Sequence, residues 1–597
     1  HTPDALNNIL DSSFRMNKTK PNLVFGCGGD RDRSKRVLMG KIANLKAENI
    51  YITDDNPRTE DSNSILLDIL KGCPRATMIS NRREAIRIAI NNLEAKQTLI
   101  IAGKGHEKYQ IIRENKFFFD DVKTANEFIK IRNSYKKKRN NKSDIFKILK
   151  NFTGSYKINS KEIRPGDIFI ALRGSKTNGN EFIEDAIKNK AKFIITDSYF
   201  SKYKSKILLV NNVIETLQYI AKYKRSQYKG KVIAVTGSAG KTSTKEQLKF
   251  FLSFALQTYA SIKSYNNFLG VNLSLANLDL KSSVAIFEIG TSNFGEIGNL
   301  SSLVKPHISI ITNVGPAHLK NFIKLTNILK EKFDIFNPKY NSKIQTIILP
   351  FKLRYKNTII DKWINKNNYK VLTFGKEKKS DIFICETKKI NNNFKTSVNF
   401  KNKIINYNLL AKGEHQITNS LITIIVFNVL NLNINFFTKN ALNLPELKGR
   451  GDVNKRVLNG KKIRIINETY NANPLSMKET IKYYSEYKKN YNIKKILLLG
   501  DMLELGNKEI FYHKKIKNYL DPKSFYQVIT YGKLIKNLYL CFKNKKNIFH
   551  FNDEINLYKH LIKYTRQDTM ILAKSSNSAD VNKFVSKLLD NKLKGIN

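Results

Sequence analysis

The stretch Lys231–Glu246, KVIAVTGSAGKTSTKE, constrains the fold of this chain more than any other. Its β-branched run Val232–Val235 predicts a buried strand, and Gly237 and Gly240 predict a sharp turn. A helix is then expected to begin near Lys241. In this arrangement backbone N–H groups converge on a phosphate chain at the helix N-terminus. The stretch therefore predicts an α/β domain that binds a nucleotide.

The polar residues of this turn have distinct expected roles. Lys241 should reach the β- and γ-phosphates, and the Thr242 hydroxyl should bind Mg²⁺. The spacing is the short TGxxGKT form, because the first glycine of the common P-loop pattern falls on Val235. ATP and Mg²⁺ are the expected cofactors, and the predicted ATP contacts are Gly237, Ser238, Ala239, Gly240, Lys241, Thr242 and Ser243.

The composition argues against a nucleic-acid-binding protein, a zinc protein and a membrane protein. A chain of 597 residues should form several domains, and its charge of +55 comes from lysines spread everywhere rather than from one basic stripe, so we expect no nucleic acid partner. The four cysteines are scattered without a CxxC pair, which predicts a reducing, cytoplasmic compartment and no zinc site. Asparagines interrupt the most apolar window, Leu421–Phe437, so no membrane span is expected.

The first 131 residues alternate strand-like and helical runs, which predicts an α/β sheet. The expected strands are Asn22–Phe25, Ile50–Thr53 and Thr98–Ala102, and the expected helices are Lys35–Leu45, Ser64–Leu70 and Arg83–Leu93. Polar loops follow the strands at Gly26–Arg36, Asp54–Asp61 and Ala102–Gln110. Such loops bind ligands in α/β folds; Arg58 suits a carboxylate, and His106 with Glu107 suits an amine.

The segments HTPDAL, FGCGGDRDRSKR, DNPRTED and AGKGHE make this region similar to the C-terminal domain of UDP-N-acetylmuramoyl-tripeptide synthetases, which are Mur ligases. The resemblance covers residues 1–125, and the DNPR form resembles the type that recognises meso-diaminopimelate. It implies amino-acid recognition by Asp55, Asn56, Pro57, Arg58, Gly103, His106 and Glu107. The family's UDP-binding and ATP-binding domains would precede His1, so we expect a fragment of a fusion whose first domain does not catalyse its own ligation.

A charged run, Asn133–Asp144, predicts a flexible linker. Beyond it, SKEIRPGDIFIALRG resembles the small UDP-binding domain of the Mur ligases that add D-alanyl-D-alanine. This implies that Ser160 contacts the substrate. Asn159 and Lys161 stand where that family usually has Asp and Arg, which changes the expected contacts.

Polar residues also end the apolar runs that follow the P-loop. Glu288 ends VAIFEIG, and His318 follows ISIITNVGPAH. Taken singly, Glu288 suits a metal ligand or a surface acid, and His318 a ligand or a core histidine. The surrounding EIGTSNFGEI and NVGPAHL resemble the Mur pattern, which implies that both hold Mg²⁺.

The resemblance also implies that Lys332, in EKFDIF, is carbamylated and binds a second Mg²⁺; a solvated helix face is the alternative. It implies that Asn267 and Asn419 contact ATP, with Gln416 where asparagine is usual. Arg450 is expected at the γ-phosphate across a domain cleft.

The motif IINETYNANPLSM matches the family's C-terminal signature and implies substrate contacts for Asn471 and Asn473. The motif LLLGDMLELG also matches. Three further positions, in the C-terminal region, also depart from the family pattern: Asn467, Ser575 and Asn577 replace Asp, Gly and Arg. These departures make reduced activity an open alternative.

We therefore expect a multidomain α/β chain with a central P-loop sheet domain. The expected domains are 1–131 (amino-acid-binding), 132–144 (linker), 145–228 (UDP-substrate-binding), 229–440 (ATP-binding) and 441–597 (C-terminal, Rossmann-like). Catalytic roles are expected for Lys241, Glu288, His318 and Lys332.

The resemblance implies ATP-dependent ligation of D-alanyl-D-alanine to UDP-MurNAc-tripeptide through an acyl phosphate, by a monomer whose partners include other cell-wall ligases. Three alternatives remain: a folylpolyglutamate synthetase-like ligase, an impaired scaffold that binds cell-wall precursors, and a small-molecule P-loop kinase.

Overall fold

The computed structural model describes residues 2–93, 97–105, 107–136, 152–174, 177–198, 201–354, 358–390, 393–411, 413–446, 451–487, 493–542 and 545–590. The chain folds as two compact units, residues 1–152 with 208–211 and residues 153–207 with 212–597. Each unit is described separately below. None of the helices in the described residues combines the length and apolarity needed to cross a lipid bilayer.

The first unit contains a parallel sheet in the order β3-β2-β1-β4. Its strands are β1 (Asn22–Phe25), β2 (Ile50–Ile52), β3 (Thr77–Met78) and β4 (Leu99–Ile101), and a hairpin of β5 (Tyr109–Ile112) and β6 (Asn115–Phe118) follows. The helices are α1 (Pro3–Asn17), α2 (Ser34–Lys46), α3 (Ser62–Gly72), α4 (Arg82–Asn92) and α5 (Asp121–Lys136). The alternation predicted from the sequence is confirmed for all three strands and all three helices.

The predicted linker begins too early. Residues Asn133–Lys136 form the last turn of α5, because nothing in this stretch breaks a helix: it has neither glycine nor proline. The rest of the predicted linker, 137–144, lies outside the described residues.

The second unit starts with a small layer around β7 (Tyr156–Lys157), β8 (Ile168–Ile170) and β9 (Phe193–Thr196), which pair in parallel. Short helices η1 (Ser160–Glu162), η2 (Gly179–Phe182), α7 (Ile183–Lys188) and η3 (Ser201–Lys206) complete it, and the chain continues into strand β10 (Ile207–Leu209), whose last two residues are assigned to the first unit. Helix α8 (Val213–Gln227) then leads to the P-loop and packs against α10 (Phe268–Ala276). The Arg225 side chain holds α8 by donating to the carbonyl oxygens of Val304 and Lys305 at 2.5 and 2.7 Å.

A nine-stranded sheet in the order β12-β13-β11-β14-β15-β16-β17-β18-β19 carries the P-loop. Strands β11 (Lys231–Thr236), β12 (Thr258–Ala260), β13 (Val284–Glu288), β14 (Ile308–Ile311), β15 (Thr346–Pro350) and β16 (Lys370–Gly375) are parallel. Strand β17 (Ile382–Ile390) pairs in parallel with β16, and β18 (Asn393–Phe400) and β19 (Lys403–Leu410) continue antiparallel. β11 and its neighbours are buried apolar runs, as expected for strands covered on both faces.

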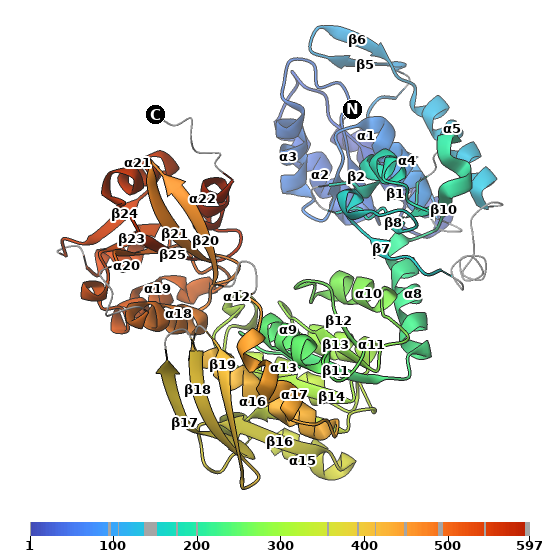
Figure 1. The fold of residues 1–597 in the computed structure, drawn as a ribbon. Coiled ribbons are helices and arrows are strands. Elements are labelled where there is room, and N and C mark those ends of the chain that lie inside the picture. The colour runs from blue at the N-terminus through green and yellow to red at the C-terminus, as the bar shows by residue number, and fades with distance from the viewer. Residues whose placement is uncertain are drawn as a thin grey trace. The chain divides into compact units, whose positions relative to one another are not determined.

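Helices cover both faces of this sheet (Figure 1). One face packs on α9 (Lys241–Leu252), α16 (Glu414–Val429) and α17 (Asn435–Asn440) with η5 (Ala441–Asn443). The other packs on α8, α10, α11 (Glu296–Val304), α13 (Leu325–Phe333), η4 (Asp334–Phe336), α14 (Phe351–Arg354) and α15 (Thr358–Asn367). The short α12 (Leu319–Phe322) belongs instead to the core of the last domain.

The last domain is a six-stranded sheet in the order β20-β21-β25-β22-β23-β24. Its strands are β20 (Asp452–Leu458), β21 (Lys461–Glu468), β22 (Lys495–Leu499), β23 (Gln527–Tyr531), β24 (Ile548–Phe551) and β25 (Met570–Lys574). Among these described strands β20 alone is antiparallel. The helices are α18 (Pro474–Glu486), η6 (Gly506–Lys508), α19 (Glu509–Lys515), η7 (Ile516–Asn518), η8 (Pro522–Ser524), α20 (Lys536–Leu540), α21 (Glu554–Tyr564) and α22 (Asp580–Leu589).

Candidate active site

The predicted strand–turn–helix is present, with β11 ending at Thr236 and α9 beginning at Lys241. Both predicted glycines are required by the geometry. A Cβ on Gly237 would lie 1.9 Å from Thr312 Oγ1, and Gly240 caps α9 with φ +78°. Side chains larger than hydrogen would therefore clash at Gly237 and be strained at Gly240. The turn leaves the N-terminus of α9 open to an anion.

Residues from neighbouring segments hold the turn. Asn313 Oδ1 accepts the Ala239 N–H at 2.9 Å, and the Thr312 hydroxyl donates to the Ala239 carbonyl oxygen at 2.6 Å. The Ser238 hydroxyl donates to the Gly315 carbonyl oxygen at 2.8 Å. Sequence reasoning missed Thr312 and Asn313, although their position just after β14, the strand beside β11, was a usable signal.

Lys241, Thr242 and Glu288 meet at the start of α9, as predicted. The Lys241 ammonium donates to the Gly237 carbonyl oxygen at 2.9 Å, across the turn that would receive the phosphates. The Thr242 hydroxyl donates to Glu288 Oε2 at 2.7 Å, and Asn266 Nδ2 donates to Glu288 Oε1 at 2.7 Å. Glu288 is 1% exposed, so its carboxylate is held by neighbours rather than by water.

This donor set fits Mg²⁺, which takes oxygen ligands and is commonly bound by one or two protein groups together with phosphate and water. The Glu288 carboxylate and the Thr242 hydroxyl are adjacent oxygens beside the turn. The described residues contain no group of three His, Cys, Asp or Glu side chains that would hold a metal by themselves. A nucleotide phosphate would therefore have to complete the shell.

Lys332, at the end of α13, is 2% exposed, so a solvated helix face is wrong for this residue. Burial, and secondarily the charge of Lys241, lowers the pKa of Lys332 well below its ordinary value. A lysine in this state carries the neutral amine that reacts with CO₂ to give a carbamate.

Among the described residues no hydrogen bond or ion pair joins His318 to Glu288; instead, His318 Nδ1 lies 2.5 Å from Glu504 Oε2. Glu504 belongs to the GDMLELG loop of the last domain, and the hydrogen bond from His318 lowers the pKa of its carboxyl. Sequence reasoning did not single out Glu504. The same loop approaches the segment after His318 again, because the Lys320 N–H donates to the Glu504 carbonyl oxygen at 3.1 Å.

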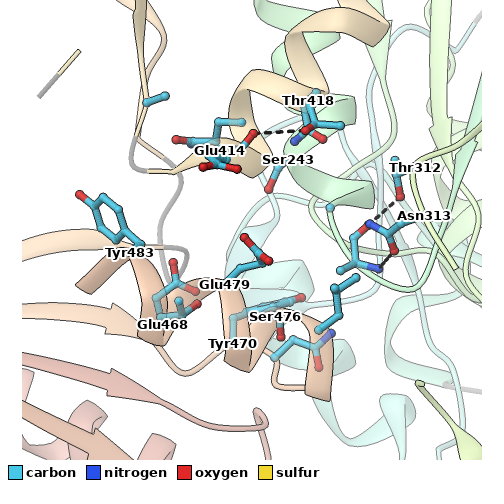
Figure 2. Close-up of a pocket in the computed structure, with 18 of the residues that line it drawn as sticks. Ser243, Thr312, Asn313, Glu414, Thr418, Glu468, Tyr470, Ser476, Glu479 and Tyr483 are labelled. Atoms are coloured by element: carbon cyan, nitrogen blue, oxygen red, sulfur yellow. Dashed lines mark hydrogen bonds between the residues drawn. The ribbon is translucent and has the colours of Figure 1, made fainter. Parts of the chain in front are cut away.

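A cavity of about 500 Å³ lies beside the P-loop, between the central and last domains (Figure 2). Figure 2 shows side chains from both domains pointing into it. Its central-domain residues are Ala239, Gly240, Ser243, Thr312, Asn313, Lys376, Leu410, Ala411, Glu414, Gln416, Thr418, Asn419, Leu444, Pro445 and Glu446. The last domain adds Val453, Glu468, Tyr470, Asn471, Asn473, Leu475, Ser476, Glu479, Thr480, Tyr483, Tyr487 and Lys574.

Asn419 supports a ligand in this cavity. It is 5% exposed, and its Nδ2 finds no hydrogen-bond partner among the described residues. A buried amide without a partner is costly, which a ligand acceptor would relieve. Gln416 also lines the cavity, whereas Asn267 is exposed and caps α10 by accepting the Gly270 N–H at 2.9 Å.

The last domain reaches the cavity through the NETYNANP segment. Asn471 lines it, and the Asn473 amide donates to the Ser238 carbonyl oxygen at 3.1 Å. Glu468 pairs with the 4% exposed Lys574 at 3.1 Å. Arg450 lies outside the described residues.

The three positions that depart from the family pattern make local contacts. Asn467 Oδ1 accepts from the Thr469 N–H and hydroxyl, the buried Ser575 hydroxyl donates to the Ser576 carbonyl oxygen, and Asn577 Oδ1 accepts from Asn582. None of the three is among the described residues that line the cavity.

Ser160 is 4% exposed at the start of η1, and its carbonyl oxygen accepts from Asn189 at 2.9 Å. The structure does not bring it to the cavity lining. Two residues further on, Glu162 pairs with Lys263 of the central domain at 2.8 Å, which joins the small layer to the P-loop layer.

In the first unit the predicted loops form a tight polar cluster around Asn56. Asn56 Oδ1 accepts from the Ile111 N–H at 2.8 Å and from the Lys104 ammonium at 3.3 Å, and its amide donates to Glu107 at 2.7 Å. Lys104 lies 3.6 Å from the buried Asp55.

Arg58, at φ +51°, donates to the Gly29 carbonyl oxygen at 2.7 Å, and Gly103 packs against Gly26. Pro57 is buried, and its carbonyl group lies close to Gly29. His106 lies outside the described residues. The structure therefore brings together six of the seven residues expected to recognise an amino acid.

A doubly covered P-loop sheet, an acid and a hydroxyl at the loop, and a second α/β domain closing over the cavity define an ATP-dependent ligase. Family profiles agree: "Mur ligase middle domain" matches residues 235–427, "Mur ligase family, catalytic domain" matches 155–225, and "Mur ligase, glutamate ligase domain" matches both 1–105 and 449–577. The chain belongs to the Mur ligase family.

Known relatives match the two parts of the chain separately. The UDP-N-acetylmuramoyl-tripeptide–D-alanyl-D-alanine ligase of Rickettsia prowazekii is 32% identical over 428 residues, covering 72% of this chain and 93% of that protein. The UDP-N-acetylmuramoyl-L-alanyl-D-glutamate–2,6-diaminopimelate ligase of Rickettsia rickettsii is 49% identical over 135 residues, covering 22% of this chain and 28% of that protein. The MurF ligase structure from Thermotoga maritima in complex with ADP has a TM-score of 0.59 at 24% identity and covers 74% of this chain and 99% of that one.

Proposed function

We propose that residues from about 145 onward ligate D-alanyl-D-alanine to UDP-MurNAc-tripeptide at the expense of ATP, in peptidoglycan precursor synthesis. The observation that carries this proposal is the Thr242–Glu288 pair at the P-loop, whose neighbours Ala239, Gly240 and Ser243 line a cavity together with residues of the last domain. The UDP-N-acetylmuramoyl-tripeptide–D-alanyl-D-alanine ligase of Rickettsia prowazekii matches 72% of the chain, and its name supports the choice of substrates.

The proposed roles follow from the contacts. Lys241 would exchange the Gly237 carbonyl for the β- and γ-phosphates, and Asn419 would donate to the nucleotide. Thr242 and Glu288 would hold Mg²⁺, which supplies charge neutralisation at the phosphates when bound. The tripeptide carboxylate would attack the γ-phosphate of ATP and release ADP. The amine of D-alanyl-D-alanine would then attack the carbonyl carbon of the acyl phosphate, form the amide and displace inorganic phosphate. Since no Ser or Cys nucleophile is required, positioning and electrostatics would provide the catalysis.

We further propose that the first unit recognises a diaminopimelate-type amino acid through the cluster around Asn56 and Arg58. Two regions that match the glutamate ligase domain in one chain suggest that parts of two consecutive ligases are joined. Calorimetric binding of meso-diaminopimelate to the full chain, lost in Arg58→Ala, tests this role; no binding by the wild type would contradict it.

The main test measures phosphate release by the full chain with ATP and Mg²⁺, omitting either the UDP-linked tripeptide or the dipeptide in turn. Release only with both UDP-MurNAc-tripeptide and D-alanyl-D-alanine is expected, and Lys241→Ala should abolish it. Release with another amine would support the family but contradict the acceptor. ATP binding without any release would favour the impaired scaffold.

A further inference from the structure

We infer that Lys245 is a positioning residue of the nucleotide site, which fixes the segment Ser261–Asn266 and through it the Glu288 carboxylate. The inference rests on the proposed nucleotide and Mg²⁺ site. It assigns a role to a second lysine of the P-loop helix, one turn after Lys241.

Lys245 is fully buried, and its ammonium has three acceptors. It donates to the carbonyl oxygen of Ser261 at 2.8 Å and to that of Lys263, and it pairs with Glu246 at 2.8 Å. Burying an ammonium is unfavourable unless its hydrogens are all satisfied, so this side chain is held in one place. Two of its three partners are backbone atoms of one loop, between β12 and α10.

That loop supplies the neighbours of the metal-site residues. The Ser261 hydroxyl accepts the Glu288 N–H at 3.1 Å, Asn266 donates to Glu288 Oε1, and Ser264 Oγ lies 3.2 Å from Thr242 Oγ1. The orientation of the Glu288 carboxylate therefore depends on where this loop lies. Lys245 contacts neither Glu288 nor the P-loop turn through a described hydrogen bond, so its influence passes through the loop.

The loop needs an anchor because Lys263 has φ +46°. A non-glycine residue in this left-handed region is strained and persists only where its surroundings fix it. The ammonium of Lys245 on the Lys263 carbonyl oxygen provides such a restraint. Lys263 also pairs with Glu162 of the small layer, so the same anchor connects the substrate-binding layer to the metal-site residues.

The test measures ADP binding to the full chain by calorimetry, with and without MgCl₂. In Lys245→Met we expect the Mg²⁺-dependent gain in ADP affinity to fall by about tenfold or more, as for outer-shell partners of metal ligands. Metal-free ADP affinity should stay within about twofold, since Lys241 and the turn are untouched. Lys249→Met, an exposed lysine of the same helix, is the matched control and should behave as wild type.

Asn266→Ala should reproduce the loss, and the double variant Lys245→Met/Asn266→Ala should be at most about threefold worse than the poorer single variant, because both act on one path. The inference would be overturned if the double variant lost affinity by the product of the two single losses. It would also be overturned if Lys245→Met kept the wild-type Mg²⁺-dependent gain in ADP affinity.

If Lys245→Met does not fold by circular dichroism, Lys245→Gln, whose NH₂ group can still donate to the loop carbonyl oxygens, replaces it and should show an intermediate Mg²⁺-dependent gain. Failure of both variants to fold would overturn the inference by assigning Lys245 to the fold alone. ADP binding does not depend on ligation. A wild-type chain that releases no phosphate would therefore contradict the proposed function, whereas the role of Lys245 would still be decided by the ADP titrations.

Discussion

The side-chain amide of Asn473, in the last domain, donates a hydrogen bond to the carbonyl oxygen of Ser238 in the P-loop at 3.1 Å. The same residue starts α18 with a capping box, in which Asn473 Oδ1 accepts the Ser476 N–H and the Ser476 hydroxyl accepts the Asn473 N–H. One asparagine thus caps the start of a helix and fastens its domain to the phosphate-binding turn.

Asn473→Ala is expected to remove both contacts. Loss of the cap should lower the free energy of unfolding by about 1 kcal/mol, and loss of the Ser238 contact should weaken ADP binding severalfold. Asp553→Ala is the matched control, because Asp553 caps α21 in the same domain without touching the P-loop. Denaturation and ADP titration of both variants check this; equal ADP affinities would contradict the role of the Ser238 contact.

Glu288→Gln should keep the shape of the site while removing its negative charge. The Mg²⁺-dependent gain in nucleotide affinity should be lost and phosphate release should fall by about 10²-fold, whereas metal-free ADP binding is unchanged. Calorimetry and a phosphate assay measure the two effects. A variant that still gains affinity from Mg²⁺ would remove Glu288 from the metal site.

Lys332 should react with CO₂ in the folded chain, because burial lowers the pKa of its ammonium and so favours the neutral amine that attacks CO₂. With ¹³C-labelled bicarbonate, NMR of the wild type should show a carbamate signal that Lys332→Ala lacks. Lys330→Ala, which changes an exposed lysine of the same helix, should retain it. A carbamate signal that survives in Lys332→Ala would assign the modification elsewhere.

His307 predicts a pH dependence of stability. Its Nδ1 accepts the Val232 N–H at 2.9 Å, and burial, aided by the nearby Arg225, lowers its pKa to about 4. Between about pH 6.5 and 4 the unfolded chain binds a proton that the folded chain does not, so stability contributed by neutral His307 falls as the pH falls. His307→Asn, which keeps an acceptor but does not titrate, should show a weaker loss of unfolding free energy over this range. An unchanged slope would exclude His307 as a contributor.

Local sequence predicted much of the fold because its signals act over short range. The run Val232–Val235, the glycines after it and Lys241 are close in sequence, and their strand, turn and helix are confirmed. The carboxyl ends of parallel strands share one edge, which is why Glu288 and the P-loop could be expected to meet. The early linker boundary failed because a charged run without glycine or proline also suits a helix.

Contacts between segments that are distant in the sequence could not be predicted from local sequence patterns. Nothing near Lys332 in the sequence shows that its side chain is buried, and nothing near His318 shows that it contacts Glu504. The position of Asn473 before Pro474 is typical of a helix cap, whereas its bond to Ser238 depends on how two domains pack.

The sequence by itself determined the P-loop, the order of strands and helices around it and the family resemblance, because these depend on residue spacing along the chain. The tertiary structure decided which side chains are buried, which carbonyl oxygens the lysines hold and what closes the cavity. Burial and charge pairing depend on distances in space between segments, and these arise only when the sheets and their helices pack together.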